Sequence, residues 1–110
     1  MGLIEKIESC LSIPRISEGG AVMDGSFATE PYITDSLRGD GEPYCVTLFT
    51  TVNLFYRTQD DAVSNAIKLY KALNSEKGIV TDEPDFTWES EAQYWRASLR
   101  VQEVITNGNE

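Results

Sequence analysis

The side chains best suited to chemistry in this chain are the carboxylates Asp82, Glu83 and Asp85, which lie around Pro84. Carboxylates at this spacing could hold a divalent cation or take part in acid-base catalysis. Proline cannot donate to a strand ladder, so the segment belongs at a sheet edge or a bulge. The sequence offers no other group that would complete the closed oxygen shell that calcium requires. We therefore expect solvated charge at these positions and no metal site.

Other catalytic chemistry has little support, because the chain contains no histidine. That absence removes the commonest general base, the Ser-His and Cys-His nucleophilic systems and the commonest zinc ligand. Cys10 and Cys45 do not have a zinc spacing, and we expect two reduced, mostly buried thiols. No glycine-rich stretch is followed by the lysine-serine or lysine-threonine pair of a phosphate-binding loop. We expect neither an enzyme nor a cofactor.

The totals describe one soluble domain over residues 1–110, with 41% hydrophobic and 25% charged residues. No apolar run approaches the roughly 20 residues that span a bilayer, so no membrane role is expected. The N-terminal stretch MGLIEKIESCLSIPR lacks the basic start of a secretory signal, and we expect the protein to remain in the cell that makes it. The net charge of −9 opposes nonspecific binding to nucleic acid or to anionic membranes.

Hydrophobic spacing predicts the elements that position these residues. Apolar positions from Leu3 to Leu11 follow a helical period and indicate a helix over residues 3–12, which must end before Pro14. Residues 13–17 could form a brief strand. Residues 18–43 are rich in glycine and proline and are predicted to form an irregular arm or loop, in which Tyr32, Ile33 and Thr34 could pair briefly.

The second half of the chain has clearer patterns. We predict a long strand over 44–57, a helix over 59–75, a hairpin of 79–90 with 93–105, and a tail over 106–110. Thr58, followed three residues later by Asp61, resembles a capping box. The expected apolar stripe of the second helix is Ala62, Val63, Ala66, Ile67, Leu69, Tyr70 and Leu73. The predicted fold is α+β: a mainly antiparallel sheet packed against two helices, in the order α-(β)-β-α-β-β.

The long strand raises a question, because both of its faces are apolar. The face from Val46 to Leu54 is nearly continuous, yet the opposite face carries Phe49 and Phe55. A strand of this length spans roughly 46 Å, whereas a compact domain of this size is only about 34 Å across. We therefore predict that the strand bends or projects, and that Phe49 and Phe55 meet a neighbouring subunit. The alternative is that they pack on the N-terminal helix or the arm.

Trp88 and Trp95 complete the candidate subunit interface. Both belong to the predicted hairpin, where they would face each other across the two strands. Such a pair can be ordinary sheet packing, or an aromatic cluster that takes part in assembly. Both interpretations stay open.

The segment from Glu42 to Ile105 resembles the small neck and tail-completion proteins of tailed bacteriophages, particularly the minor capsid or tail terminator group. The resemblance is carried by PYCVTLFTTVNLFYRTQDDAVSNAIKLYKALNS, a strand leading into a helix, and by the following hairpin DEPDFTWESEAQYWRASLRVQEV. The arm over residues 18–43 departs from that pattern. The resemblance implies a virion protein of the tail or neck, assembled in the host cytoplasm.

The same resemblance implies a homo-oligomeric hexameric ring. Its partners would be the tail-tube protein, whose polymerisation the ring ends, and the head connector or stopper protein. Genomic DNA would pass through a negative lumen without specific binding. A head-tail connector is the close alternative. The acidity also admits another class, a small DNA-mimic inhibitor of a nucleic-acid enzyme.

Overall fold

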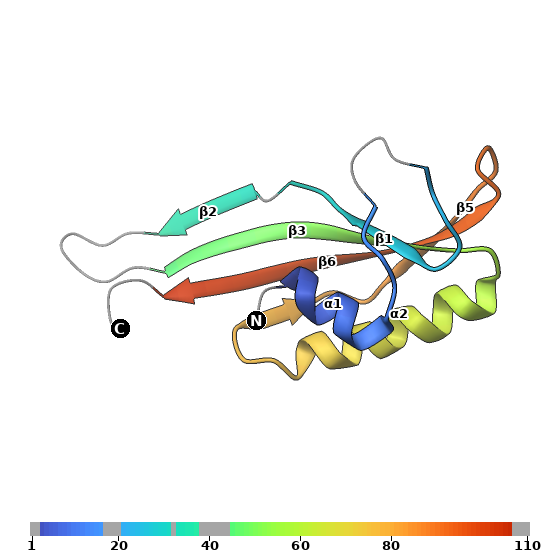
Figure 1. The fold of residues 1–110 in the computed structure, drawn as a ribbon. Coiled ribbons are helices and arrows are strands. Elements are labelled where there is room, and N and C mark those ends of the chain that lie inside the picture. The colour runs from blue at the N-terminus through green and yellow to red at the C-terminus, as the bar shows by residue number, and fades with distance from the viewer. Residues whose placement is uncertain (1–2, 17–20, 32, 38–44, 107–110) are drawn as a thin grey trace.

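The computed structural model describes residues 3–16, 21–31, 33–37 and 45–106. The fold is α+β, as predicted: an antiparallel six-stranded sheet lies against two helices (Figure 1). The helices and strands are α1 (Leu3–Leu11), β1 (Ser26–Thr29), β2 (Ile33–Leu37), β3 (Cys45–Tyr56), α2 (Gln59–Asn74), β4 (Ile79–Thr81), β5 (Asp85–Glu89) and β6 (Tyr94–Thr106).

The centre of the sheet is the antiparallel pair β3 and β6. Their ladder runs without a slip from Cys45 opposite Thr106 to Tyr56 opposite Trp95. β1 and β2 follow one another along the outer edge of β3, and β4 and β5 do the same along β6. The sheet is therefore a long two-stranded ribbon with a broken strand on each side.

Two predicted segments need correction. The arm predicted over residues 18–43 contains β1 and β2, since both pair with β3; the rest of the arm that is described is residues 21–25, 30 and 31. Ile33 and Thr34 do pair, as the sequence suggested, but as part of a longer strand, β2. The predicted strand over 79–90 is two strands, β4 and β5, interrupted around Pro84. β1 and β2 are four and five residues long, too short for a periodic signal. They form because the edge of β3 offers unpaired backbone groups.

Both interruptions contain one extra residue. Thr29 faces Val52 and Ile33 faces Phe49, so four steps along the edge match three along β3. The step from Thr81 to Asp85 likewise matches only three steps of β6. One extra residue on an edge strand is a β-bulge. Pro31 and Pro84 lie within the two bulges, where a missing N–H removes no ladder bond.

The two bulges lie at the same level of the ribbon, which we call the waist. Glu30 N–H donates to Thr51 O at 3.0 Å, and Asp82 N–H donates to Arg100 O at 3.0 Å. Thr51 and Arg100 face each other in the central ladder. The edge strands on both sides of the ribbon are therefore interrupted at the level of this one residue pair.

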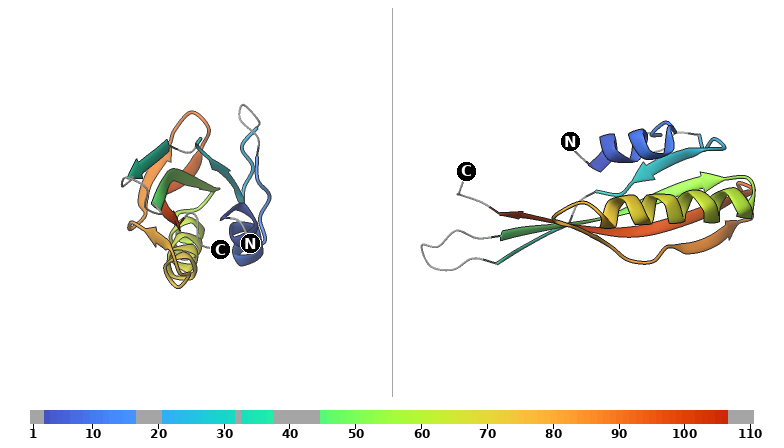
Figure 2. Two further views of the ribbon diagram at one scale, coloured as in Figure 1. Left: turned by 90° about the vertical axis from the view of Figure 1, so that its left-hand side faces the viewer. Right: turned by 90° about the horizontal axis from the view of Figure 1, so that it is seen from below.

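The hydrophobic core lies between the sheet and the two helices, which cover the same face of the sheet (Figures 1 and 2). The central strands contribute alternate residues to it, as a sheet with one covered face requires. The buried hydrophobic side chains are Leu3, Ile7, Leu11, Phe27, Val52, Leu54, Tyr56, Ala62, Ala66, Leu69, Leu73, Ile79, Ala97, Leu99 and Val101. Val52 and Leu54 lie beneath the helices, as the strand pattern predicted.

One member of the predicted α2 stripe is misplaced. Ala62, Ala66, Leu69 and Leu73 are buried at alternating spacings of four and three residues, whereas Ile67 is exposed. Ile67 follows Ala66 by one residue, which turns its side chain about 100° around the helix, away from the sheet. An isoleucine on the solvent side of α2 therefore has no role in the core.

Local interactions fix the ends of α2. The Thr58 hydroxyl accepts from Asp61 N–H at 3.2 Å, so Thr58 is the N-cap as predicted. The Asn74 side chain forms two hydrogen bonds with the edge of β4: its Oδ1 accepts from Thr81 N–H at 2.8 Å, and its Nδ2 donates to Thr81 O at 3.3 Å. Gly78 has φ +85°, a left-handed conformation that suits glycine in the turn to β4.

The protein is elongated, with principal extents of 51 × 26 × 20 Å and a radius of gyration of 15.4 Å. A compact chain of this length has a radius of about 13 Å. β2 and the adjoining ends of β3 and β6 extend past the helices, toward the left of Figure 1 and of the right-hand view in Figure 2. The central strands thus project beyond the helical layer, as their length predicted.

Candidate interaction surface

The face of the sheet turned away from the helices is the candidate site. Phe49 and Phe55 belong to it, since they alternate along β3 with the buried Val52 and Leu54. Phe55 is half-buried and faces Ser26 of β1, within the predicted arm. Phe49 is exposed. The two phenylalanines therefore lie outside the core, and Phe55 is next to the arm.

Three exposed apolar side chains gather near the waist, and we call them the outer patch. Phe49 is 37% exposed, Val80 55% and Val104 39%. Gln102 faces Phe49 across the β3–β6 ladder and faces Val80 across the β4–β6 ladder. Val104 follows Gln102 on the same face of β6, two residues on. Exposed apolar side chains from three neighbouring strands thus lie around Gln102, which separates Phe49 from Val80.

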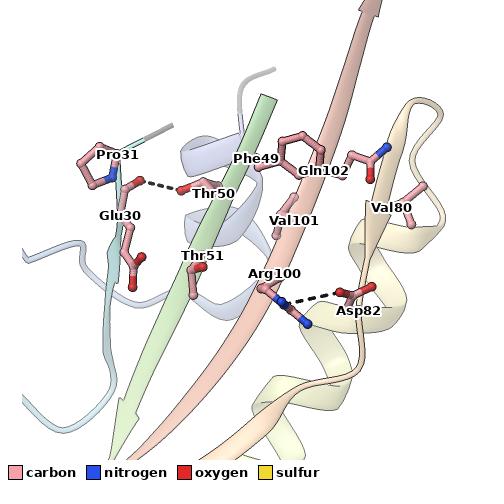
Figure 3. Close-up of a pocket in the computed structure, with 10 residues that line it drawn as sticks. All are labelled: Glu30, Pro31, Phe49, Thr50, Thr51, Val80, Asp82, Arg100, Val101 and Gln102. Carbon is pink, nitrogen blue, oxygen red and sulfur yellow. Dashed lines mark hydrogen bonds and ion pairs between the residues drawn. The ribbon is translucent and has the colours of Figure 1, made fainter. Parts of the chain in front are cut away.

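A hollow of about 370 Å³ lies beside the outer patch. Figure 3 shows Glu30 and Pro31 at one edge of it, Val80 and Asp82 at the other, and Phe49 with Gln102 between them. The remaining lining comes from Thr50, Thr51, Arg100 and Val101. The hollow is therefore the waist itself, open where both edge strands bulge.

Hydrogen bonds hold the β1 side of the hollow in place. The Thr50 hydroxyl donates to Glu30 O at 2.6 Å, and the Asn53 side-chain amide donates to the Glu30 carboxylate at 3.4 Å (Figure 3 shows the first). Ser98 Oγ donates in turn to Asn53 Oδ1 at 2.7 Å. This polar row runs from Glu30, which follows β1, across β3 to β6. The outer face is thus polar on one side of the waist and apolar on the other.

The charges near the hollow are mostly negative. Arg100 pairs with Asp82 at 3.5 Å, but both side chains are exposed, so the pair adds little stability. Glu30 lines the hollow, Glu83 follows Asp82 in the exposed β4–β5 link, and Asp85 begins β5. Four carboxylates accompany Arg100, and a second cation, Arg15, lines an adjoining hollow with Glu30 and Pro31. A partner that docks here is therefore favoured when its own surface is basic.

Trp88 and Trp95 face each other across β5 and β6, as the hairpin pattern predicted. Their ring centroids are 5.6 Å apart, with planes inclined at 55°. Trp95 packs against the core, whereas Trp88 is exposed. Both project from the helix-covered face, since Trp95 alternates with outward-facing Arg96. The four predicted interface residues therefore do not form one surface: the phenylalanines and the tryptophans lie on opposite faces of the sheet.

The structure also places the remaining candidates for chemistry. Asp82, Glu83 and Asp85 are all exposed. In the part of the chain that is described, no three His, Cys, Asp or Glu side chains form a group that could hold a metal ion. Cys10 is a free, half-buried thiol that packs against the core. The side chain of Cys45 lies outside the described set.

Tyr56 is the one buried group with a strongly shifted pKa among the residues described. Burial raises the pKa of its phenol to about 12, and the nearby charges of Asp61 and Asp24 act in the same direction. The hydroxyl has no hydrogen-bond partner in the structure. It lies in the helix-covered core, apart from the hollow, and it is neutral at physiological pH, as a phenol of ordinary pKa is too.

The comparisons with known proteins leave the family open. No family model matches the chain, and no curated protein sequence is significantly similar to it. No helix among the described residues is long and apolar enough to cross a membrane. The outer face of the sheet and the sequence pattern are therefore the features that bear on function.

The sequence pattern missed part of this surface. It identified Phe49, but not Val80 or Val104, because each is a small apolar residue next to an isoleucine that belongs to the opposite face of its strand. Two signals could have found the hollow: Pro31 and Pro84, which mark the bulges on either edge. Their common level became apparent only when the register of all the strands was known.

Proposed function

We propose that this chain is a structural protein that assembles into a homo-oligomeric ring at the head-proximal end of a bacteriophage tail. There it ends polymerisation of the tail tube and joins the tail to the head connector. The observation that carries the assembly is the outer patch, since Phe49, Val80 and Val104 form an apolar group on the bare face of a projecting sheet. Exposed apolar groups of this kind mark interaction sites.

The shape of the chain supports the same proposal. Exposed apolar side chains on an uncovered sheet face are an aggregation hazard in an isolated protein. The two proline-containing bulges interrupt both edges at the waist, which limits open-ended strand pairing at that level. The sheet face without helices stays accessible. In a closed oligomer each subunit would cover this face of its neighbour, so no such face would remain exposed.

The assignment to a phage tail rests on the sequence pattern from Glu42 to Ile105. Its strand-helix link is present as β3, the capped turn at Thr58 and α2, and its hairpin is present as β5 and β6. The net charge of −9 supports a passage through which DNA slides without adhering, because like charges repel the phosphate backbone. A hexamer and virion location are part of the same proposal.

Electron microscopy of the purified protein, alone and mixed with tail tubes, tests this function. The genes beside the one encoding this chain identify the tube protein to use. Rings at the tube ends, and tubes of fixed length, are the expected result. Rings that bind only to the portal assembly would change the assignment to a head-tail connector or stopper. A protein that forms no ring and binds neither the tail tubes nor the portal assembly would refute the proposal.

The acidity also favours a second candidate, a DNA mimic that blocks a nucleic-acid enzyme. The exposed carboxylates of Asp82, Glu83 and Asp85 are its motivation. This candidate predicts a monomer or dimer that inhibits a DNA-binding protein and loses its effect in high salt. A binding assay against DNA-processing enzymes at low and high salt separates it from the ring, which requires no such target.

A further inference from the structure

Self-assembly of this chain has to overcome electrostatic repulsion. Eighteen acidic and nine basic residues give each copy a charge of −9, so identical surfaces repel one another. A ring avoids this problem if a basic surface of one copy meets an acidic surface of the next. Heterologous contacts allow this pairing, because they join two different surfaces of the same chain.

The second half of α2 carries a basic surface that could make such a contact. Its outward stripe, which we call the α2 ridge, consists of Ser64, Ile67, Lys68 and Lys71. Ile67 is 42% exposed. Among the described residues neither lysine forms an ion pair. The acidic Asp60 and Asp61 lie at the other end of α2, about 10 Å from Lys68 at 1.5 Å per residue. The ridge is therefore an apolar side chain next to two free cations.

The outer patch has the opposite character. Phe49 and Val80 of the patch line an open hollow of about 370 Å³, and the nearby carboxylates of Glu30, Asp82, Glu83 and Asp85 outnumber the cations Arg100 and Arg15. The ridge therefore offers a protruding apolar side chain with positive charge, and the patch a recess with negative charge. Each surface supplies what the other lacks.

We propose that the α2 ridge of one copy docks on the outer patch of the next, with Ile67 in the hollow and Lys68 and Lys71 beside the carboxylates of the β4–β5 link. This inference rests on the proposed ring and specifies its subunit contact. The helices of each copy would cover the bare sheet face of its neighbour. The contact repeats the helix-on-sheet layering that already exists within one subunit. Its two halves are on different faces of the chain, so it continues from copy to copy until the ring closes.

Charge reversal on each surface provides the test. One variant carries Lys68→Glu and Lys71→Glu, and the other carries Glu83→Lys and Asp85→Lys. None of these four side chains is buried or belongs to an ion pair in the described structure, so both variants should fold, which circular dichroism checks. In either variant alone the two docking surfaces have the same sign. Light scattering should then give the mass of a single chain.

Mixing the two variants distinguishes this contact from a general effect of charge. The ridge of the first variant is now negative and can pair with the positive patch of the second. The native, positive ridge of the second variant can pair with the native, negative patch of the first. The equimolar mixture should therefore regain the ring mass, with the two chains alternating. A mixture that stays monomeric would overturn the docking geometry. Either variant forming normal rings alone would overturn it as well.

A crosslinking experiment reports the contact directly. In a background with Cys10→Ala and Cys45→Ala, one protein carries Ile67→Cys and another Val80→Cys. A short bismaleimide should link the two proteins when mixed, and should give no dimer with either one alone. Dimers of one variant alone would indicate a symmetric contact and refute the docking. If the background protein forms rings but the mixture does not crosslink, this contact is wrong and the ring stands; a monomeric background refutes both.

Discussion

The division of β3 into a core face and an outer face predicts that alanine substitutions there differ in cost. Leu54 is fully buried between the sheet and the helices. Truncating it removes its buried methyl groups and leaves an enclosed cavity, so Leu54→Ala should lower the free energy of unfolding by about 2–5 kcal/mol. Phe49 lies five residues earlier on the opposite face, where no helix covers it.

The cost at Phe49 follows from its exposure. Fully burying a phenylalanine side chain stabilises a protein by about 1.5–3 kcal/mol. With 37% of Phe49 exposed, roughly two thirds of that benefit is present, and truncation leaves no closed cavity because the site opens to solvent. Phe49→Ala should therefore lower the free energy of unfolding by about 1–2 kcal/mol. This is less than half of the loss that Phe→Ala causes at a well-packed core position.

Urea unfolding followed by the fluorescence of Trp88 and Trp95 measures both values. The experiment uses a protein concentration at which light scattering shows single chains, since assembly would add to the apparent stability. The slope of the transition should be the same for wild type and both variants. A loss of 3 kcal/mol or more for Phe49→Ala would show that both faces of β3 are core, and the interaction surface would have to be abandoned.

Three further substitutions test local features. Thr58→Ala removes the N-cap of α2 and should cost about 1 kcal/mol in urea unfolding; no change would contradict the cap. Asn74→Ala removes both bonds to the edge of β4 and should cost about 1–3 kcal/mol, against less than about 0.5 for the exposed control Ser64→Ala. Tyr56→Phe should be neutral or slightly stabilising at pH 7, because the buried hydroxyl has no partner. Above pH 10 it should become the more stable protein: the folded pKa is about 12 and the unfolded one about 10, so the wild type alone loses stability across that interval. A Tyr56→Phe variant that is less stable at pH 7 would refute this account.

The long elements were predictable because their patterns are local. α2 has a cap at Thr58, four buried positions at helical spacing and a glycine after its end, and its observed bounds differ from the predicted ones by one residue. β3 and β6 alternate over a dozen residues each. Each of these signals lies within the element it predicts, so no tertiary information was needed.

The edge strands were not predictable in the same way. β1 and β2 are SFAT and ITDSL, and neither contains enough alternation to be distinguished from a loop. Their pairing depends on β3, which lies more than ten residues away for most of their positions. β4 and β5 read as one strand until the bulge at Pro84 separates them. Long-range pairing, and not local propensity, decides such segments.

The candidate site shows the same division. Phe49 and Phe55 were identified because they break the expected polarity of a strand face. Trp88 and Trp95 were correctly predicted to be neighbours, but the sequence could not show that they project from the face opposite the phenylalanines. The face on which each of these side chains lies depends on the registers of the β5–β6 and β3–β6 pairs together. The hollow at the waist depends on two bulges that are more than fifty residues apart in the chain.

The mass of the purified wild-type protein in solution shows whether the chain assembles into a closed ring. Light scattering over a range of concentrations, with and without the tail-tube protein, measures it without modifying the chain. We expect a closed assembly of six chains, with six times the 12.3 kDa mass of one chain, and this mass should stop increasing with concentration. A single-chain mass at every concentration, in the presence of the tube protein as well, would contradict it.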